Sequence, residues 1–178
     1  MYKIFSFIGW LILFHLVIIF SYLYGNYKLD KDSQQEQIIA YQKNYSIPKS
    51  DSDIYFGYIE FPKYKLERLI KYGDPNKVIE EAYIGIFGST PINYPKDSLI
   101  LVGHSRVNQF EILHSMEKHD QINIIKRDKK YIYKIITKKE ISADDLSFLN
   151  DIKSNQLILI TCFDDSTKRL LVICNIIK

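Results

Sequence analysis

The sequence LILITCFDDSTKRLLVIC, residues 157–174, holds two apolar runs joined by a short polar loop. The first run ends on Cys162, and the second begins directly after Arg169. Short aliphatic runs on both sides of polar turn residues predict a β-hairpin. In such a hairpin Cys162 and Arg169 face each other across the mouth of the loop, where directly opposite Cβ atoms lie about 4.5–5.5 Å apart. A cation at that distance favours the thiolate over the thiol, or binds a developing oxyanion.

Turn signals such as Pro62, Gly73 and Arg-Asp-Lys at residues 127–129 divide the rest of the C-terminal part into similar short runs rich in Ile, Val and Tyr. Short strands with few long helical connections are typical of a mainly β protein that forms a closed or nearly closed β-barrel. We therefore expect an eight-stranded barrel, with strands at residues 55–61, 66–70, 83–87, 99–102, 122–126, 131–137, 157–162 and 170–177.

Three short helices are predicted between these strands, each beginning at a residue type that caps helices. The expected caps are Asp74, Asn108 and Ser142. Apolar residues that share one helix face are expected to point inward; they are Phe110, Leu113 and Met116 in the second helix, and Leu146 and Leu149 in the third.

The N-terminal run from Ile4 to Tyr24 carries no formal charge. At about 1.5 Å per residue it is long enough to cross a hydrocarbon core of about 30 Å. A cleaved signal peptide would be shorter and would end on small residues, whereas this run ends in Ser-Tyr-Leu-Tyr, which favours an uncleaved anchor.

Three segments follow from these patterns. Residues 1–27 are expected to form the membrane anchor, residues 28–53 a polar linker with a short helix, and residues 54–178 the barrel domain. Ser33 and Glu36 have the spacing of a capping box for the linker helix.

Composition excludes several classes of protein. A chain of 178 residues, with 47% hydrophobic and 14% aromatic residues, is globular rather than disordered. The net charge is only +3 and no Lys/Arg block is present, so we expect no nucleic-acid partner. Two Cys cannot form a disulfide scaffold, and no His/Cys cluster has zinc-ligand spacing, so we expect no metal and no cofactor.

A cysteine nucleophile needs a proton carrier. His104 follows an apolar strand and Gly103, so it stands at a strand end, as Cys162 does. His15 lies in the apolar N-terminal run, and His114 and His119 are expected on the surface. Cys162, His104 and Arg169 are therefore three chemically capable residues, each expected at the end of a barrel strand.

At these residues the sequence resembles the sortases, membrane-anchored cysteine transpeptidases of Gram-positive bacteria. Sortases carry a TLxTC motif with an Arg at the start of the next strand, which corresponds to ILITC at residues 158–162 and to Arg169, with Ile158 replacing the first Thr. They also carry an apolar strand that ends in Gly-His, as in LILVGHS with His104. The resemblance extends from about Gly57 to Ile177.

The resemblance implies a sortase-type barrel and a ping-pong reaction without a cofactor. Cys162 would attack an LPxTG-like sorting signal of a surface protein to give a thioacyl enzyme. An amine acceptor of a peptidoglycan precursor would then release the product. His104 would be the general acid/base, Arg169 would bind substrate and stabilise the oxyanion, and Thr161 would line the substrate groove.

The resemblance also implies a single-pass membrane protein with its N-terminus inside the cell and its catalytic domain, residues 54–178, outside. The Lys count beside the span does not by itself support this orientation, because only Lys3 precedes it whereas Lys28, Lys31 and Lys43 follow. The interval between residues 137 and 157 is too short for the long helix usual in class B, so the sequence is more similar to class D.

Other interpretations stay open at this point. An L,D-transpeptidase is also a Cys/His catalyst, but its His lies two residues before the Cys, where this chain has Ile160. From a different class, the chain would be a membrane-anchored, non-catalytic binding module, or a degenerate sortase.

The second thiol, Cys174, is expected to be a free core residue. Its offset from Arg169 along the predicted strand corresponds to about 17 Å at about 3.4 Å per residue. A disulfide with Cys162 would need Cα atoms within about 7 Å. The odd offset also turns Cys174 to the other face of the sheet, with Leu170 and Val172.

Overall fold

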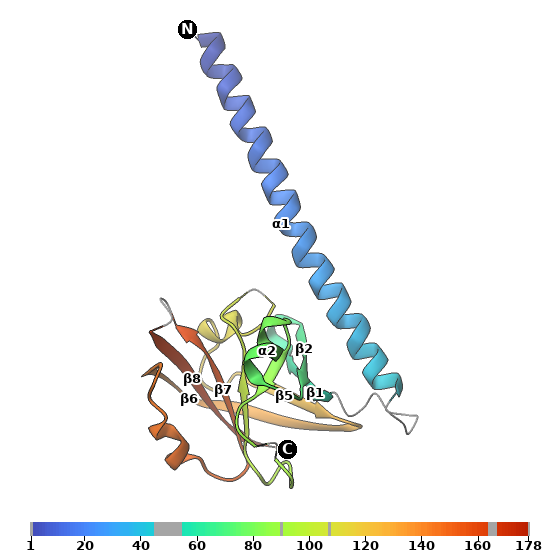
Figure 1. The fold of residues 1–178 in the computed structure, drawn as a ribbon, viewed down its shortest axis with the longest axis vertical. Coiled ribbons are helices and arrows are strands. Elements are labelled where there is room, and N and C mark those ends of the chain that lie inside the picture. The colour runs from blue at the N-terminus through green and yellow to red at the C-terminus, as the bar shows by residue number, and fades with distance from the viewer. Residues whose placement is uncertain (1, 45–54, 90, 107, 164–166, 178) are drawn as a thin grey trace. The chain divides into compact units, whose positions relative to one another are not determined.

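The computed structural model describes residues 2–44, 55–89, 91–106, 108–163 and 167–177 (Figure 1). The chain divides into two compact units, residues 1–33 and residues 34–178. Residues 45–53 of the predicted linker, and residues 164–166 of the predicted hairpin loop, lie outside the described residues.

Helix α1 (Tyr2–Asn44) contains the predicted apolar span. In the described part of the chain it is the one helix that is long and apolar enough to cross a membrane. The expectation that a separate short helix begins at Ser33 in the linker is wrong, because α1 continues through Ser33. The Ser33 hydroxyl does not cap a helix; it donates to the carbonyl of Asp30 at 2.9 Å, a local bond that Ser forms inside helices.

The second unit contains a closed eight-stranded barrel, which confirms the predicted fold class (Figure 1). Around the barrel the strands follow the order β1-β2-β3-β4-β7-β8-β6-β5. Neighbours are antiparallel except for the parallel pairs β2–β3 and β4–β7. The strands are β1 (Tyr55–Phe61), β2 (Leu66–Lys71), β3 (Ile84–Ile86), β4 (Leu99–Val102), β5 (Gln121–Lys126), β6 (Lys129–Ser142), β7 (Gln156–Phe163) and β8 (Lys168–Ile176).

Among the connections, η1 (Pro62–Tyr64) is a single 3₁₀ turn, and α2 (Pro75–Glu80) begins as the sequence predicts. The Asp74 carboxylate accepts a hydrogen bond from the backbone N–H of Asn76 at 2.9 Å. This bond satisfies one of the free N–H groups of the first turn and fixes where α2 starts.

The second predicted helix is the 3₁₀ helix η2 (Glu111–His114), and Asn108 does not cap it. Asn108 has a left-handed backbone with a φ of 72°, which Asn tolerates better than most residues. Its carbonyl accepts from the Nε of the buried Arg68, so a contact distant in sequence replaces the local cap. The expected inward residues are confirmed, because Phe110, Leu113 and Met116 are all buried.

The predicted start of the third helix is wrong. Ser142 still belongs to β6, where it pairs with Lys168 of β8, and the 3₁₀ helix η3 begins only at Ser147 (Ser147–Asp151). The expected inward residues Leu146 and Leu149 are exposed, since the strand ladder extends beyond the point at which the local pattern favoured a helix.

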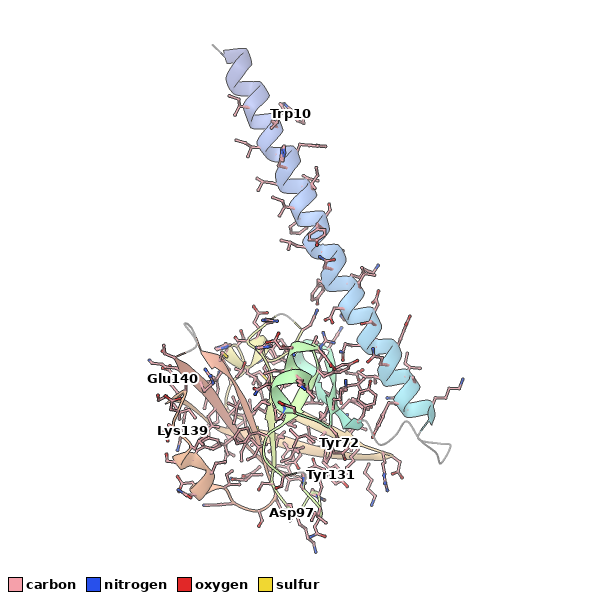
Figure 2. The ribbon with its side chains drawn as sticks, in the orientation of Figure 1. Trp10, Tyr72, Asp97, Tyr131, Lys139 and Glu140 are labelled. Atoms are coloured by element: carbon pink, nitrogen blue, oxygen red, sulfur yellow. The ribbon has the colours of Figure 1, made fainter. Side chains whose placement is uncertain are left out.

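An aromatic cluster packs at one end of the barrel. Phe56 contacts Tyr72 and Tyr94 edge to face, and Tyr94 contacts Tyr131 with ring centroids 4.8 Å apart. Figure 2 labels two members of this cluster, Tyr72 and Tyr131. The Tyr133 hydroxyl donates to that of Tyr94 at 2.9 Å, and burial raises the pKa of Tyr133 to about 12. Tyr133 pairs with the last residues of β8, so this end of β8 is the one opposite to Arg169.

The last part of α1 packs on the outside of the barrel within the second unit. Ile38 and Tyr41 are buried in a cluster with Tyr58, Leu69 and Ile125. Two glutamines of the same segment form hydrogen bonds to tyrosine hydroxyls: Tyr83 donates to Gln37 at 2.7 Å and Gln42 donates to Tyr58 at 2.8 Å. The domain boundary predicted at residue 54 stays a prediction, and because residues 37–42 contact the barrel, truncation on either side of them can test it.

Two truncations test the role of this helical segment. Removal of residues 1–27 is expected to leave the unfolding free energy of the barrel unchanged. Removal of residues 1–53 is expected to lower it by about 3–6 kcal/mol, because two large buried side chains, Ile38 and Tyr41, are lost at about 1.5–3 kcal/mol each. Urea denaturation measures both values. Equal stability of the two truncations would contradict a structural role for residues 34–44.

The hairpin of β7 and β8 separates the two thiols. Cys162 pairs with Arg169, whereas Cys174 pairs with Leu157 at the other end of the ladder. Both cysteines are free, and Cys174 is fully buried beside Leu170 and Val172, as the sequence predicts.

Thiol titration tests this register. The purified chain, denatured without reductant, is expected to release two free thiols. A count of zero, with a mass lower by two hydrogens, would show that the two cysteines can approach each other and that the hairpin register is not maintained in solution.

Candidate active site

The parallel pairing of β4 and β7 brings His104 and Cys162 to the same edge of the barrel. Val102 is in register with Ile160. Cys162 lies two residues further along β7, and His104 lies two residues beyond the end of β4. The backbone N–H of Gly103 donates to the carbonyl of Ile160 at 3.2 Å, which extends the pairing toward His104. The two side chains predicted from distant parts of the sequence therefore belong to one site.

Gly103 is required for the close packing beneath His104. A Cβ at this position would lie 2.9 Å from a ring carbon of Phe110, closer than real Cβ contacts. The backbone N–H of Phe110 also donates to the carbonyl of His104 at 3.0 Å. The loop after β4 is thus folded back onto the barrel, and it presents His104 at the rim.

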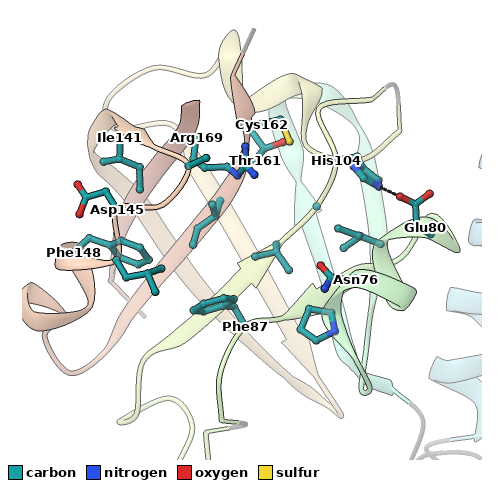
Figure 3. Close-up of a pocket in the computed structure, with 17 residues that line it drawn as sticks. Asn76, Glu80, Phe87, His104, Ile141, Asp145, Phe148, Thr161, Cys162 and Arg169 are labelled. Carbon is teal, nitrogen blue, oxygen red and sulfur yellow. Dashed lines mark hydrogen bonds and ion pairs between the residues drawn. The ribbon is translucent and has the colours of Figure 1, made fainter. Parts of the chain in front are cut away.

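Arg169 lies directly opposite Cys162 in the β7–β8 ladder, as the hairpin predicts. Both side chains are half-buried, and Figure 3 shows the guanidinium pointing toward Cys162. One Arg169 nitrogen, Nη1, donates to the carbonyl of Lys168 at 3.2 Å. A cation beside an accessible thiol favours nucleophilic chemistry at sulfur or the binding of an oxyanion.

The other thiol does not suit this chemistry. Cys174 is fully buried in the core, and desolvation by burial raises the pKa of its thiol far above the usual value. A buried thiol in apolar surroundings is inert because the thiolate is the reactive form.

A cavity of about 460 Å³ contains the site. The three predicted residues and Thr161 line it together, and its two walls differ in character (Figure 3). One wall, from α2, carries Pro75, Asn76, Ile79 and Glu80. The other, from β6, η3 and the chain between them, carries Ile141, Ala143, Asp145, Leu146 and Phe148, and Phe87, which follows β3, also lines the cavity.

Thr161 holds a buried hydroxyl next to the thiol. The residue is 2% exposed, and among the described residues its Oγ1 has no hydrogen-bond partner. An unsatisfied buried hydroxyl is costly, so a polar group of a bound ligand would gain by pairing with it.

Two carboxylates lie on opposite walls of the cavity. Asp145 accepts from the backbone N–H of Ser147 at 2.9 Å, and hydrogen bonds from Ser147 lower the pKa of Asp145. Glu80 accepts from the Nε2 of His104 at 3.0 Å, and Figure 3 shows the imidazole turned toward it. Among the described side chains, His104 and Cys162 form no hydrogen bond with each other.

Sequence reasoning identified Cys162, His104, Arg169 and Thr161, and the fold brings all four to one cavity. It missed Glu80. The helix that carries Glu80 was predicted from Asp74 and the proline after it, but the contact with His104 depends on how the chain folds back, and no local pattern signals it.

Solved structures similar to this chain are sortases. Sortase C1 from Streptococcus agalactiae is 22% identical, with a TM-score of 0.62, and the match covers 83% of this chain and 89% of that one. Sortase E1 from Streptomyces coelicolor is 20% identical, with a TM-score of 0.62 and coverage of 73% and 92%. Sortase A from Listeria monocytogenes is 23% identical, with a TM-score of 0.62 and coverage of 71% and 89%. At these identities the similarity concerns the fold.

A comparison with curated protein sequences gives no match. The family model for the sortase domain, in contrast, matches residues 59–177, which include nearly the whole barrel and all four site residues. The chain therefore belongs to the sortase family.

Proposed function

We propose that this chain is a sortase that cleaves an LPxTG-like sorting signal and transfers the cleaved protein to an amine of a peptidoglycan precursor. The observation that carries the proposal is the register of β7, which places Cys162 opposite Arg169 on one side and level with His104 on the other. A thiol, a guanidinium and an imidazole at one rim are the groups that acyl transfer by a cysteine requires.

The reaction proceeds in two halves. The Cys162 thiolate attacks the scissile carbonyl carbon, and Arg169 stabilises the oxyanion that forms. The C–N bond breaks as His104, in its protonated form, donates a proton to the leaving amine. An acceptor amine then attacks the thioester carbonyl and loses a proton to His104. The C–S bond breaks, and Cys162 leaves as the thiolate, so the starting state is restored. No step requires a cofactor.

The cavity walls suit an apolar peptide with polar backbone groups. Phe87, Ile141 and Phe148 offer apolar surface for the Leu and Pro side chains of such a signal. The buried hydroxyl of Thr161 offers a partner for a peptide carbonyl or N–H beside the thiol.

Apolar helix α1 supports a single-pass membrane protein, and the cell-wall acceptor requires the barrel to lie outside the cell with the N-terminus inside. Its partners are surface proteins with a C-terminal sorting signal and the peptidoglycan precursor. Within residues 143–155 the one helical element is the 3₁₀ helix η3, which agrees with the expectation against class B. Similarity to class D stays a prediction, since the structural neighbours named above belong to classes C, E and A.

The first test compares the two thiols. Cys162→Ala is expected to abolish hydrolysis and transpeptidation of a sorting peptide, because the nucleophile is lost. Cys174→Ala, the matched control in the same hairpin, is expected to keep most activity. Product formation with and without an added amine, followed by mass spectrometry, measures both reactions. Substantial turnover by Cys162→Ala would refute the assignment of the nucleophile and favour a different catalytic residue.

Arg169→Lys tests the role of the guanidinium. This variant keeps the charge but loses the planar fork of donors. Removal of one oxyanion donor typically lowers the rate by about 10²–10³, and a loss of that order in kcat/KM is expected. A near-normal rate with Lys at this position would mean that Arg169 acts only as a general positive charge.

A further inference from the structure

We propose that Glu80 is a positioning residue for His104: its carboxylate holds the imidazole in one tautomer and one orientation through Nε2. The catalytic part of this inference rests on the proposed sortase function, whereas the contact itself does not. Neither the TC and Arg motif nor the Gly-His motif includes Glu80. This residue lies on α2, on the cavity wall across from Asp145 and Phe148, and its side chain points toward His104 (Figure 3).

The chemistry of the contact determines which nitrogen carries the proton. The Glu80 Oε1 lies 3.0 Å from the His104 Nε2, and an ionised carboxylate can only accept hydrogen bonds. Nε2 must therefore be protonated. In the neutral ring the lone pair is then on Nδ1, which leaves Nδ1 as the nitrogen that can exchange a proton with the substrate.

Glu80 is held in place although its side chain is 63% exposed. The side chain of Gln109 is buried, and its Nε2 donates to the carbonyls of Ile79 at 3.1 Å and Tyr83 at 3.0 Å. Gln109 belongs to the loop that begins at His104, so one amide joins this loop to both ends of the short segment that carries Glu80.

Two packing contacts fix the rest of α2. Val78 is buried beneath the helix. Gly85 allows close approach of the helix start to β3, because a Cβ there would lie 3.2 Å from the Cα of Pro75. Glu80 thus extends from a helix that is fixed on both sides, and its carboxylate can act as a defined support for the ring.

The second oxygen of Glu80 also has a cationic neighbour. The Arg106 Nη1 lies 3.9 Å from Oε2, and both side chains are well exposed. Exposed ion pairs of this kind contribute little to folding stability. The value of the Glu80 contact therefore lies in orienting a proton carrier, for which small displacements matter, rather than in stabilising the barrel.

The proposed reaction gives this orientation a purpose. In the acylation half, protonated His104 gives its Nδ1 proton to the leaving amine, and in the second half Nδ1 takes a proton from the acceptor amine. Nε2–H stays bound to Glu80 throughout. Without Glu80 the ring would be free to rotate and to exchange tautomers, and only a fraction of the molecules would present Nδ1 correctly.

Imidazole NMR tests the contact without reference to activity. The full chain, labelled with ¹⁵N-histidine in detergent micelles, is studied at a pH at which the ring is neutral, and His104→Gln assigns the signal. The Nε2–H tautomer is expected in the wild type and in Glu80→Gln, whose amide oxygen can still accept. A tautomer mixture is expected in Glu80→Ala. Glu81→Ala is the matched control, because Glu81 pairs instead with Lys71. An unchanged His104 signal in Glu80→Ala would overturn the proposal.

Kinetics test the positioning role in the same set of variants. Glu80→Ala is expected to lower kcat about tenfold, a part of the 10²–10⁴ that general acid–base catalysis contributes, with KM unchanged within twofold. Glu80→Gln is expected to restore most of the loss, and Glu81→Ala to match the wild type. Equal kcat in Glu80→Ala and wild type, or a change confined to KM, would overturn the positioning role.

The two proposals can fail separately. If no variant and no wild-type chain transfers a sorting peptide, while the His104 tautomer still depends on Glu80, the sortase reaction is refuted and the Glu80 contact stands. If the wild type is active and the tautomer is independent of Glu80, the sortase reaction stands and the positioning role is refuted.

Discussion

The site depends on the hydrogen-bond register of β7 with its two neighbours. Parallel pairing with β4 sets Cys162 level with His104, and antiparallel pairing with β8 sets it opposite Arg169. A slip of one residue in either ladder would turn the thiol to the other face of the sheet. The alternating buried residues of β7 and β8, which belong to the barrel core, oppose such a slip because it would expose them to water.

The rest of the barrel maintains this register from outside the site. The aromatic cluster around Tyr94 packs at the end of the barrel opposite to the end where Cys162, His104 and Arg169 line the cavity. Beneath His104, Gly103 and Phe110 pack too closely for any larger residue. Residues 34–41 of α1 cover apolar side chains of β1, β2 and β5 on the outer surface.

The strands could be predicted from the sequence because each is a short apolar run with clear turn residues at its ends. Cys162, Arg169 and His104 could be found because their positions at strand ends follow from the same pattern. The helices were harder to predict than the strands. Asn108 and Ser142 look like caps, but the contact with Arg68 and the long β6–β8 ladder determine their conformations. Glu80 was missed because its contact with His104 depends on chain folding between segments that carry no shared local signal.

The most direct test of the account is the mass of the acylated enzyme. The full chain is incubated with a sorting peptide without an amine acceptor, quenched in acid, and digested to locate any adduct. The account predicts one acyl group, joined as a thioester to Cys162 and removed when an amine acceptor is added before the quench. Peptide cleavage without an adduct, or an acyl group on any residue other than Cys162, would contradict it.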